Sequence, residues 1–187
     1  MRNATTRRAI TDIAIGGTQL IVVTLTAPLL RRWYNRWGAT RSEVDARLVG
    51  DDLVTEPKLG YTRAVTIDAV PEDVWMWLVQ LGQGRGGFYS YDGLENLVGC
   101  QIHSAESILP EYQHLDVGDV ISSGPGNSPS WVVVHAEPPN HLVLIGADSD
   151  GNPPPISVQI PERGYVASTW QWILRPHHDG RTRLIVR

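Results

Sequence analysis

A chain of 187 residues with 42% hydrophobic and 19% charged residues is long enough for one folded domain and an appendage, and this composition excludes a disordered chain. The formal net charge of −4 is unevenly distributed, because residues 1–50 carry eight arginines against three acidic residues and the rest of the chain is strongly acidic. A basic leader on an acidic domain suits an anionic membrane surface and argues against nucleic acid, whose phosphates the domain would repel. The single cysteine, Cys100, excludes an intrachain disulfide and a cysteine metal cluster.

An uncharged run of eighteen residues spans residues 13–30. As a helix it would be about 27 Å long, which is enough to cross a bilayer. Arginines and aromatic residues alternate directly after it, as they do at membrane interfaces: Arg31, Arg32, Trp33, Tyr34, Arg36 and Trp37. We therefore expect an anchor over residues 1–36 with a transmembrane helix at 13–30, the alternatives being a buried helix or a cleaved signal peptide. More arginines follow the run than precede it, which predicts a single-pass protein of the cell membrane with its domain on the cytoplasmic side.

Residues 37–60 are polar and lack periodicity, and we expect a linker there. Residues 61–68 alternate as a strand does, with Arg63, Val65 and Ile67 on one face. Pro71 then suits the first turn of a helix that is apolar on most sides and stops at Gly82.

The stretch from Leu81 to Gly99 holds a cluster of glycines followed by three aromatic residues. Glycines at this density indicate a backbone path that other residues cannot follow. Asp92 and Glu95 have the spacing of a capping box, so we expect a short helix after the loop. A further helical turn is expected over residues 104–109, ended by Pro110.

The second half of the chain is rich in short β-type runs that Gly, Pro, Asn and Asp separate. The expected strands cover residues 120–122, 131–135, 141–145, 166–174 and 182–186. The chain therefore predicts an α+β domain over residues 61–187, built from one strand, short helices and an antiparallel meander.

Several of these segments resemble a bacterial, membrane-anchored branch of the SRPBCC superfamily, which includes START-like, polyketide cyclase/dehydrase-like and pollen-allergen-like domains. The resemblance covers roughly residues 37–187. It is carried by Arg63 to Asp68, Pro71-Glu72-Asp73-Val74-Trp75, Gly86-Gly87-Phe88-Tyr89-Ser90-Tyr91-Asp92 with Leu94-Glu95-Asn96-Leu97, Ile102-His103, Ile108-x-Pro110-Glu111, Val117-Gly118-Asp119 and Gly180-Arg181-Thr182-Arg183-Leu184.

The resemblance implies a helix-grip fold, in which a curved antiparallel sheet wraps round a long C-terminal helix and leaves a hydrophobic cavity between them. Two features depart from the family pattern. Gly93 stands where relatives often carry tryptophan, and no candidate for the long helix precedes Arg187. We therefore expect a C-terminally incomplete domain, with the sheet face that carries Trp170, Trp172 and Leu174 left open to self-association or a partner.

Catalytic chemistry has little support in the sequence. The glycine loop leaves a helix, whereas dinucleotide-binding loops enter one, so we expect no nucleotide cofactor. His103 and Glu106 are weak candidates for a general acid/base pair, with solvent-facing turns as the alternative. The remaining histidines lack a third ligand at metal spacing, and we expect no metal site.

The aromatic residues say more about a binding site than the acidic residues do. Indole and phenol groups can line a cavity whose walls are apolar and still offer a few hydrogen bonds, although they can equally form plain core. The candidate ligand-binding residues are Trp75, Phe88, Tyr89, Tyr91, Trp131, Trp170 and Trp172.

Three hypotheses follow. The first is a membrane-anchored domain that binds a hydrophobic small molecule or lipid without catalysis. The second is a cyclase or dehydrase-type enzyme that uses His103 with a nearby carboxylate. The third is a structural or regulatory membrane protein that meets its partner through the sheet face.

Overall fold

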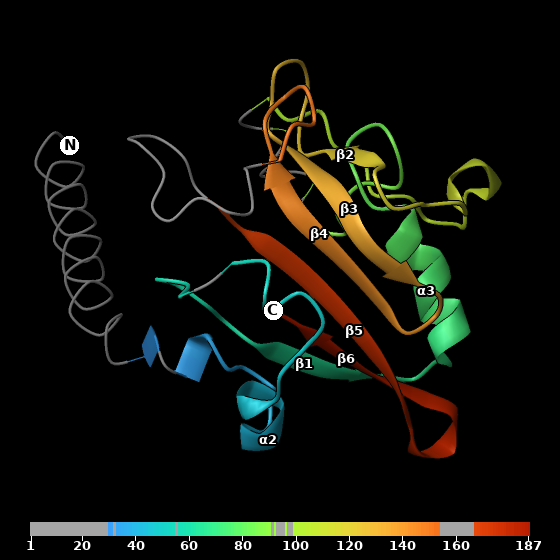
Figure 1. Cartoon of the computed structure of the whole chain (residues 1–187). Helices are drawn as coiled ribbons and strands as arrows, with labels where there is room; N and C mark the ends of the chain where they lie inside the picture. Colours follow the sequence, from blue (N-terminus) through green and yellow to red (C-terminus); the bar gives the residue numbers. More distant parts are fainter. Residues whose placement is uncertain are drawn as a thin grey trace, which may run out of the picture.

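The computed structural model describes residues 30–187 apart from residues 32, 55, 91, 93–95, 97–98 and 154–166. Its central feature is one antiparallel sheet of six strands in the order β1-β6-β5-β4-β3-β2 (Figure 1). The described elements are α2 (Arg41–Asp45), β1 (Arg63–Ile67), α3 (Pro71–Val79), β2 (Val120–Ser122), β3 (Ser130–Glu137), β4 (His141–Ala147), β5 (Thr169–His177) and β6 (Arg181–Val186), with 3-10 turns at Pro110–Tyr112 and His178–Gly180. The predicted α+β class with a mainly antiparallel sheet is confirmed.

The helical predictions are met in part. Helix α3 begins at Pro71 as expected, and Gln80 caps it just before the predicted stop. Residues 104–109 form no helix, and a 3-10 turn begins at Pro110 instead. The reason is that this segment makes its hydrogen bonds to other parts of the chain, including those from Ser104 to Asp92 and from Leu109 to Gln80. Glu95, the partner of Asp92 in the expected capping box, lies outside the described residues.

The anchor expected at residues 13–30 falls, apart from Leu30, outside the described residues. Within the part of the chain that the structure describes, no helix has the length and apolar character needed to cross a membrane.

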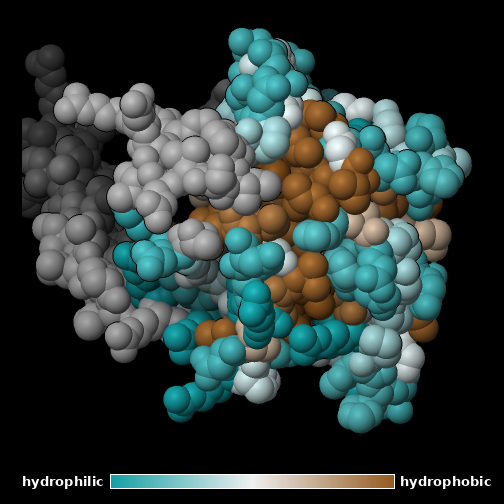
Figure 2. Space-filling model, viewed as in Figure 1, coloured by the Kyte–Doolittle hydropathy of each residue, from teal (hydrophilic) through white to brown (hydrophobic). Residues whose placement is uncertain are grey.

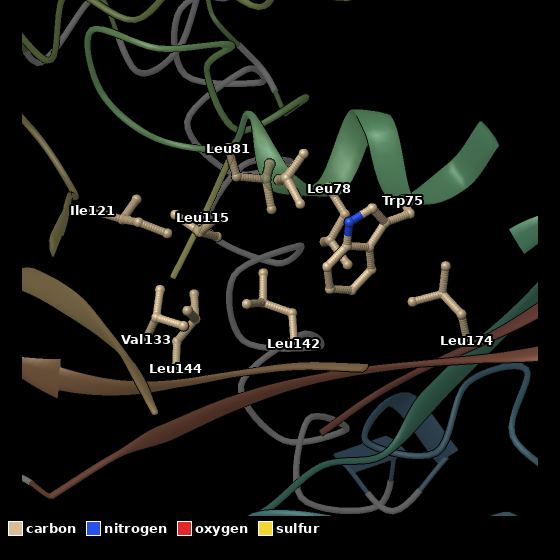
Figure 3. Packing of buried hydrophobic residues seen from close by; sticks show 10 residues of the cluster. Trp75, Leu78, Leu81, Leu115, Ile121, Val133, Leu142, Leu144 and Leu174 are labelled. Carbon is tan, nitrogen blue, oxygen red and sulfur yellow. The ribbon is translucent and has the colours of Figure 1, made fainter. Parts of the chain in front are cut away.

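One face of the sheet packs against α3. Strands β4 and β5 place Leu142 opposite Trp172 and Leu144 opposite Trp170, so these four side chains lie on the same face. Figure 3 shows the helix side chains, Trp75 among them, pointing down onto this face. The cluster comprises Trp75, Leu78, Val79, Leu81, Leu115, Ile121, Val133, Leu142, Leu144 and Leu174. Burial of each large side chain contributes about 1.5–3 kcal/mol, so this contact is the main source of stability for α3.

The expectation of an open face for Trp170, Trp172 and Leu174 is corrected by this packing. Leu174 is buried, and the two tryptophans are half-buried against the α3 cluster. Helix α3 is apolar on the side that meets the sheet, so it occupies the face on which a different helix was expected.

The opposite face is covered by residues 38–51, which the sequence presented as part of a linker. Arg183 of β6 donates to both carboxylate oxygens of Glu43, at 2.7 and 2.9 Å, and to the carbonyl oxygen of Gly38. Leu48 packs beneath α2 against Ala64 and Ile185. The polar composition of residues 38–51 predicted a linker because many of their contacts with the sheet are made by charged side chains.

Arg187 adds a second set of contacts on the same face. It donates to Asp51 at 2.7 Å and to the carbonyl oxygens of Glu43, Val44 and Ala46. Burial disfavours the charge on Asp51, yet hydrogen bonds from the Leu48 N–H group and from Arg187 hold its pKa below the ordinary value. These charges are therefore paired as buried charges must be.

In the glycine loop, three backbone segments approach one another closely. A Cβ atom at Gly86 would lie 2.8 Å from the carbonyl oxygen of Gln80. Gly87 has a φ of +74° and would place a Cβ 2.8 Å from the carbonyl oxygen of His103. Side chains are therefore excluded at both positions, which accounts for the Gly86-Gly87 pair.

The fully buried Gln80 side chain joins these segments. Its amide nitrogen donates to the Tyr89 hydroxyl at 2.6 Å and to the carbonyl oxygen of Ser107 at 3.2 Å. Its amide oxygen accepts from the Leu109 N–H group at 2.9 Å and from Gln113 at 3.2 Å. One amide thus fixes the loop and the segment at 107–113 to the end of α3.

Replacing Glu43 by Gln should lower the free energy of unfolding at pH 7 by about 2–3 kcal/mol. The hydrogen bonds from Arg183 lower the pKa of Glu43 from 4.5 to about 2. Because the folded pKa is the lower one, the stabilisation is complete above about pH 4.5 and is lost as the pH falls towards 2. Urea unfolding between pH 7 and pH 2 measures it.

Asp45→Asn is the matched control, because Asp45 lies on the same helix and pairs with Arg41 only in solvent. We expect little change in its stability. If wild type and Glu43→Gln lost stability in parallel between pH 4.5 and 2, the assignment of that loss to Glu43 would be refuted.

Replacing Gln80 by Leu should cost about 2–4 kcal/mol, because buried groups that bond to the amide lose their partner. Amide hydrogen exchange should also become faster at Leu109. Gln83→Leu is the control in the same loop, since Gln83 makes one exposed hydrogen bond to the carbonyl oxygen of Gln101. Equal destabilisation by the two variants would contradict the central role of Gln80.

Candidate functional site

Four aromatic side chains gather on the sheet face that α3 covers, and we call them the aromatic row: Phe88, Trp131, Trp170 and Trp172. The rings of Trp170 and Trp172 lie 4.8 Å apart between centroids, and those of Trp131 and Trp170 lie 5.4 Å apart. Phe88 stacks on Trp170 at 6.3 Å. All four are half-buried and pack against the edge of the α3 cluster. The row is therefore a continuous aromatic surface with part of its area uncovered.

Strand pairing and one glycine bring the tryptophans together. Trp170 and Trp172 are two residues apart on β5, so they point to the same side. Trp131 on β3 faces Gly146 on β4, and Gly146 has no side chain to separate Trp131 from Trp170. A Cβ atom at Gly146 would lie 3.8 Å from the Trp131 ring and 2.5 Å from the Ser168 hydroxyl.

The row carries three indole N–H groups, and that of Trp172 stands out. Its Nε1 atom is buried and has no hydrogen-bond acceptor within the part of the chain that the structure describes. Buried indole N–H groups are normally satisfied, and one that is not calls for a specific explanation. The Trp172 N–H group is therefore a buried hydrogen-bond donor without a partner among the described residues, and its ring packs against that of Trp170.

The other predicted ligand-binding residues are placed differently. Trp75 is buried in the α3 cluster, and Tyr91 lies outside the described residues. Tyr89 packs edge-on against Trp77 at 5.7 Å and accepts from Gln80, and burial raises the pKa of its hydroxyl. Tyr89 is therefore engaged by the loop and by the outer side of α3.

The candidate acid/base pair is on the surface. His103 and Glu106 are both exposed. The nearby Asp92 carboxylate accepts from the N–H and hydroxyl groups of Ser104, and these bonds lower the pKa of Asp92. Asp92 thereby holds the backbone beside His103, and the geometry gives a catalytic pair no support. Among the described residues, no three His, Cys, Asp or Glu side chains converge as metal ligands do.

A cleft of about 200 Å³ lies beside α3, and Trp75 is the one predicted ligand-binding residue that lines it. Its lining residues are Trp75, Val79, Gln113, His114, Leu115, Asp116, Val117, Ala136 and Pro138. Pockets for drug-sized ligands span roughly 300–1,000 Å³, so this cleft suits a small group or one end of a longer molecule. Neither His103 nor Glu106 lines it.

Sequence reasoning missed this cleft with the exception of Trp75. The segment at 113–116 shows no motif, and the nearness of residues 113–117 to Pro138 depends on the β3–β4 turn. The sequence signal that was present is the Pro138-Pro139-Asn140 turn, which marks one end of the hairpin but not its neighbour.

Apolar side chains also reach the outer surface. Figure 2 shows them gathered over β3, β4 and β5 in the middle of the face in view, with hydrophilic side chains around them. An apolar area with a polar border is the kind of surface that takes apolar ligands or partners.

Neither a protein-family model nor a curated protein matches this sequence. Solved structures that resemble it include CalU16 from Micromonospora echinospora, with 15% identity and a TM-score of 0.35 over 66% of this chain and 55% of that one. The Aha1 dimer from Colwellia psychrerythraea has 16% identity and a TM-score of 0.37 over 67% and 71% of the two chains. Protein MLL2253 from Mesorhizobium loti has 18% identity and a TM-score of 0.33 over 67% and 75%.

These three structures have folds of the SRPBCC and polyketide cyclase-like kind. This chain spans only about 55% of the length of CalU16.

Proposed function

We propose that this protein is a membrane-anchored domain of helix-grip type that binds a hydrophobic small molecule or lipid without chemical change. The observation that carries the proposal is the aromatic row, in which half-buried rings pack together and the buried N–H group of Trp172 has no acceptor among the described residues. Aromatic faces favour an apolar body, and the indole donor favours one oxygen acceptor on it. The ligand class is therefore a fatty acid or another apolar molecule with a carbonyl, carboxyl or hydroxyl group.

The membrane part of the proposal is supported by the sequence. The uncharged run at 13–30 and the arginines and aromatics after it have the pattern of a single-pass anchor. A domain held at a membrane is well placed to take an apolar ligand from the bilayer. The distribution of arginines favours the cytoplasmic side.

A binding function is also favoured over the cyclase or dehydrase hypothesis. General acid/base catalysis requires groups within hydrogen-bond reach of a bound substrate. The exposed side chains of His103 and Glu106 belong neither to the aromatic row nor to the cleft beside α3.

Replacing Trp172 by Phe tests the directed hydrogen bond. The substitution keeps an aromatic ring and removes the N–H donor, so binding of an oxygen-bearing ligand should weaken about fivefold.

Trp170→Ala removes the centre of the row and should weaken binding about tenfold or more. Binding is measured on the full chain by native mass spectrometry and by thermal shift with a library of fatty acids and phospholipids.

Trp77→Ala is the matched control, because Trp77 lies on the outer side of α3 and contacts Tyr89 instead of the row. It should bind as wild type does. The proposal fails if the whole library leaves wild type empty and its melting temperature unchanged. It also fails if Trp170→Ala binds as well as Trp77→Ala.

A further inference from the structure

The β1 side of the domain carries a group of exposed aromatic residues. Trp33, Tyr34 and Trp37 are 64%, 57% and 56% exposed, and Tyr61 is 42% exposed. Large aromatic side chains at such exposure leave apolar area in water, and several together mark a binding surface. We call these four residues, together with Arg63, the aromatic edge.

The aromatic edge is built into the folded domain. The N–H groups of Thr62 and Ala64 donate to the carbonyl oxygens of Asn35 and Trp37, so residues 35–37 run beside β1. Arg63 lies between two rings, with its guanidinium carbon 4.3 Å from the centre of Tyr34 and 5.0 Å from the centre of Tyr61. Residues from the segment before the domain and from β1 therefore form one surface.

Val65 extends this surface along β1. Arg63 and Val65 are two residues apart on β1, so they lie on the same side of the strand. Val65 is 45% exposed, although it belongs to a strand of the sheet. Leu59, directly before this region, is 72% exposed.

The charge close to the aromatic edge is mainly positive. Among the described residues of the ranges 30–37 and 57–67, Arg31, Arg36, Lys58 and Arg63 are basic and none is acidic, while Glu56 and Asp68 lie directly outside the second range. Tryptophan, tyrosine and arginine are the residues that settle at the headgroup level of a bilayer, where rings meet the acyl boundary and guanidinium groups meet phosphate.

We propose that the aromatic edge lies in the headgroup layer of an anionic bilayer, so that the folded domain rests on the membrane by its β1 side. This orientation rests on the proposed membrane location and not on ligand binding at the aromatic row.

Depth measurements with a fluorescent label test this orientation on the full chain reconstituted in vesicles. In a Cys100→Ser background, a nitrobenzoxadiazole label is attached at Leu59→Cys beside the aromatic edge. The control label is at Val117→Cys, which is 65% exposed and directly precedes the region of β2, at the opposite edge of the sheet. The vesicles contain phosphatidylcholine alone or with phosphatidylglycerol, and brominated lipids serve as quenchers.

With phosphatidylglycerol present, the label at position 59 should shift its emission to the blue and be quenched by brominated lipid, while the label at 117 should do neither. High salt should reverse the effect, because the charges lie at the surface. Arg36→Gln should lower, about fivefold, the ratio of molecules whose label at position 59 is in the membrane to those whose label is in water. This is the effect expected for one basic residue at an anionic surface.

Each other outcome overturns the inference. If the chain stays in the vesicles and label 59 remains as exposed as label 117, the anchor holds and the docked orientation is wrong. If label 59 is shifted equally in both lipids and is not quenched, a protein partner or a second copy covers the edge. Quenching that is equal in both lipids and insensitive to salt refutes the requirement for anionic lipid.

Discussion

The pairing of two β6 arginines with the segment before the domain is the constraint on which the rest of the structure depends. Arg183 and Arg187 would be costly in a packed interior without partners, and they obtain them from Glu43, Asp51 and several carbonyl groups of residues 38–46. These bonds close one face of the sheet with a polar segment. The short α3 therefore has only the other face to cover.

Helix α3 covers that other face incompletely, and this is what creates the candidate site. The helix buries Trp75, Leu78 and Val79 against side chains of β3, β4 and β5, and Gln80 then fixes the chain that follows. The aromatic row lies at the margin of this cover, packed on one side and accessible on the other. The same rings thus stabilise the core and remain able to contact a ligand.

The order of the strands relates the two proposed surfaces. The aromatic edge lies beside β1 and includes Arg63 of that strand, and the tryptophans of the row belong to β3 and β5, with β6 between β1 and β5. The row is therefore separated from the edge by a single strand at its nearest point. A domain that rests on a bilayer by its β1 side keeps the row near the membrane, which is the source expected for an apolar ligand.

Alternation and proline are local signals, so the sequence alone predicted the six strands and the start of α3, although β5 (Thr169–His177) begins three residues later than expected. The glycines at 86 and 87 likewise indicated a backbone path that other residues cannot follow. Only the tertiary structure decided which residues meet. Residues 38–51 pack on the sheet through Arg183 and Arg187, more than 130 positions away, and no local pattern encodes such a pair. Likewise, the sequence supplied the tryptophans, but strand register brought Trp131 to Trp170 and left the Trp172 N–H group without an acceptor among the described residues.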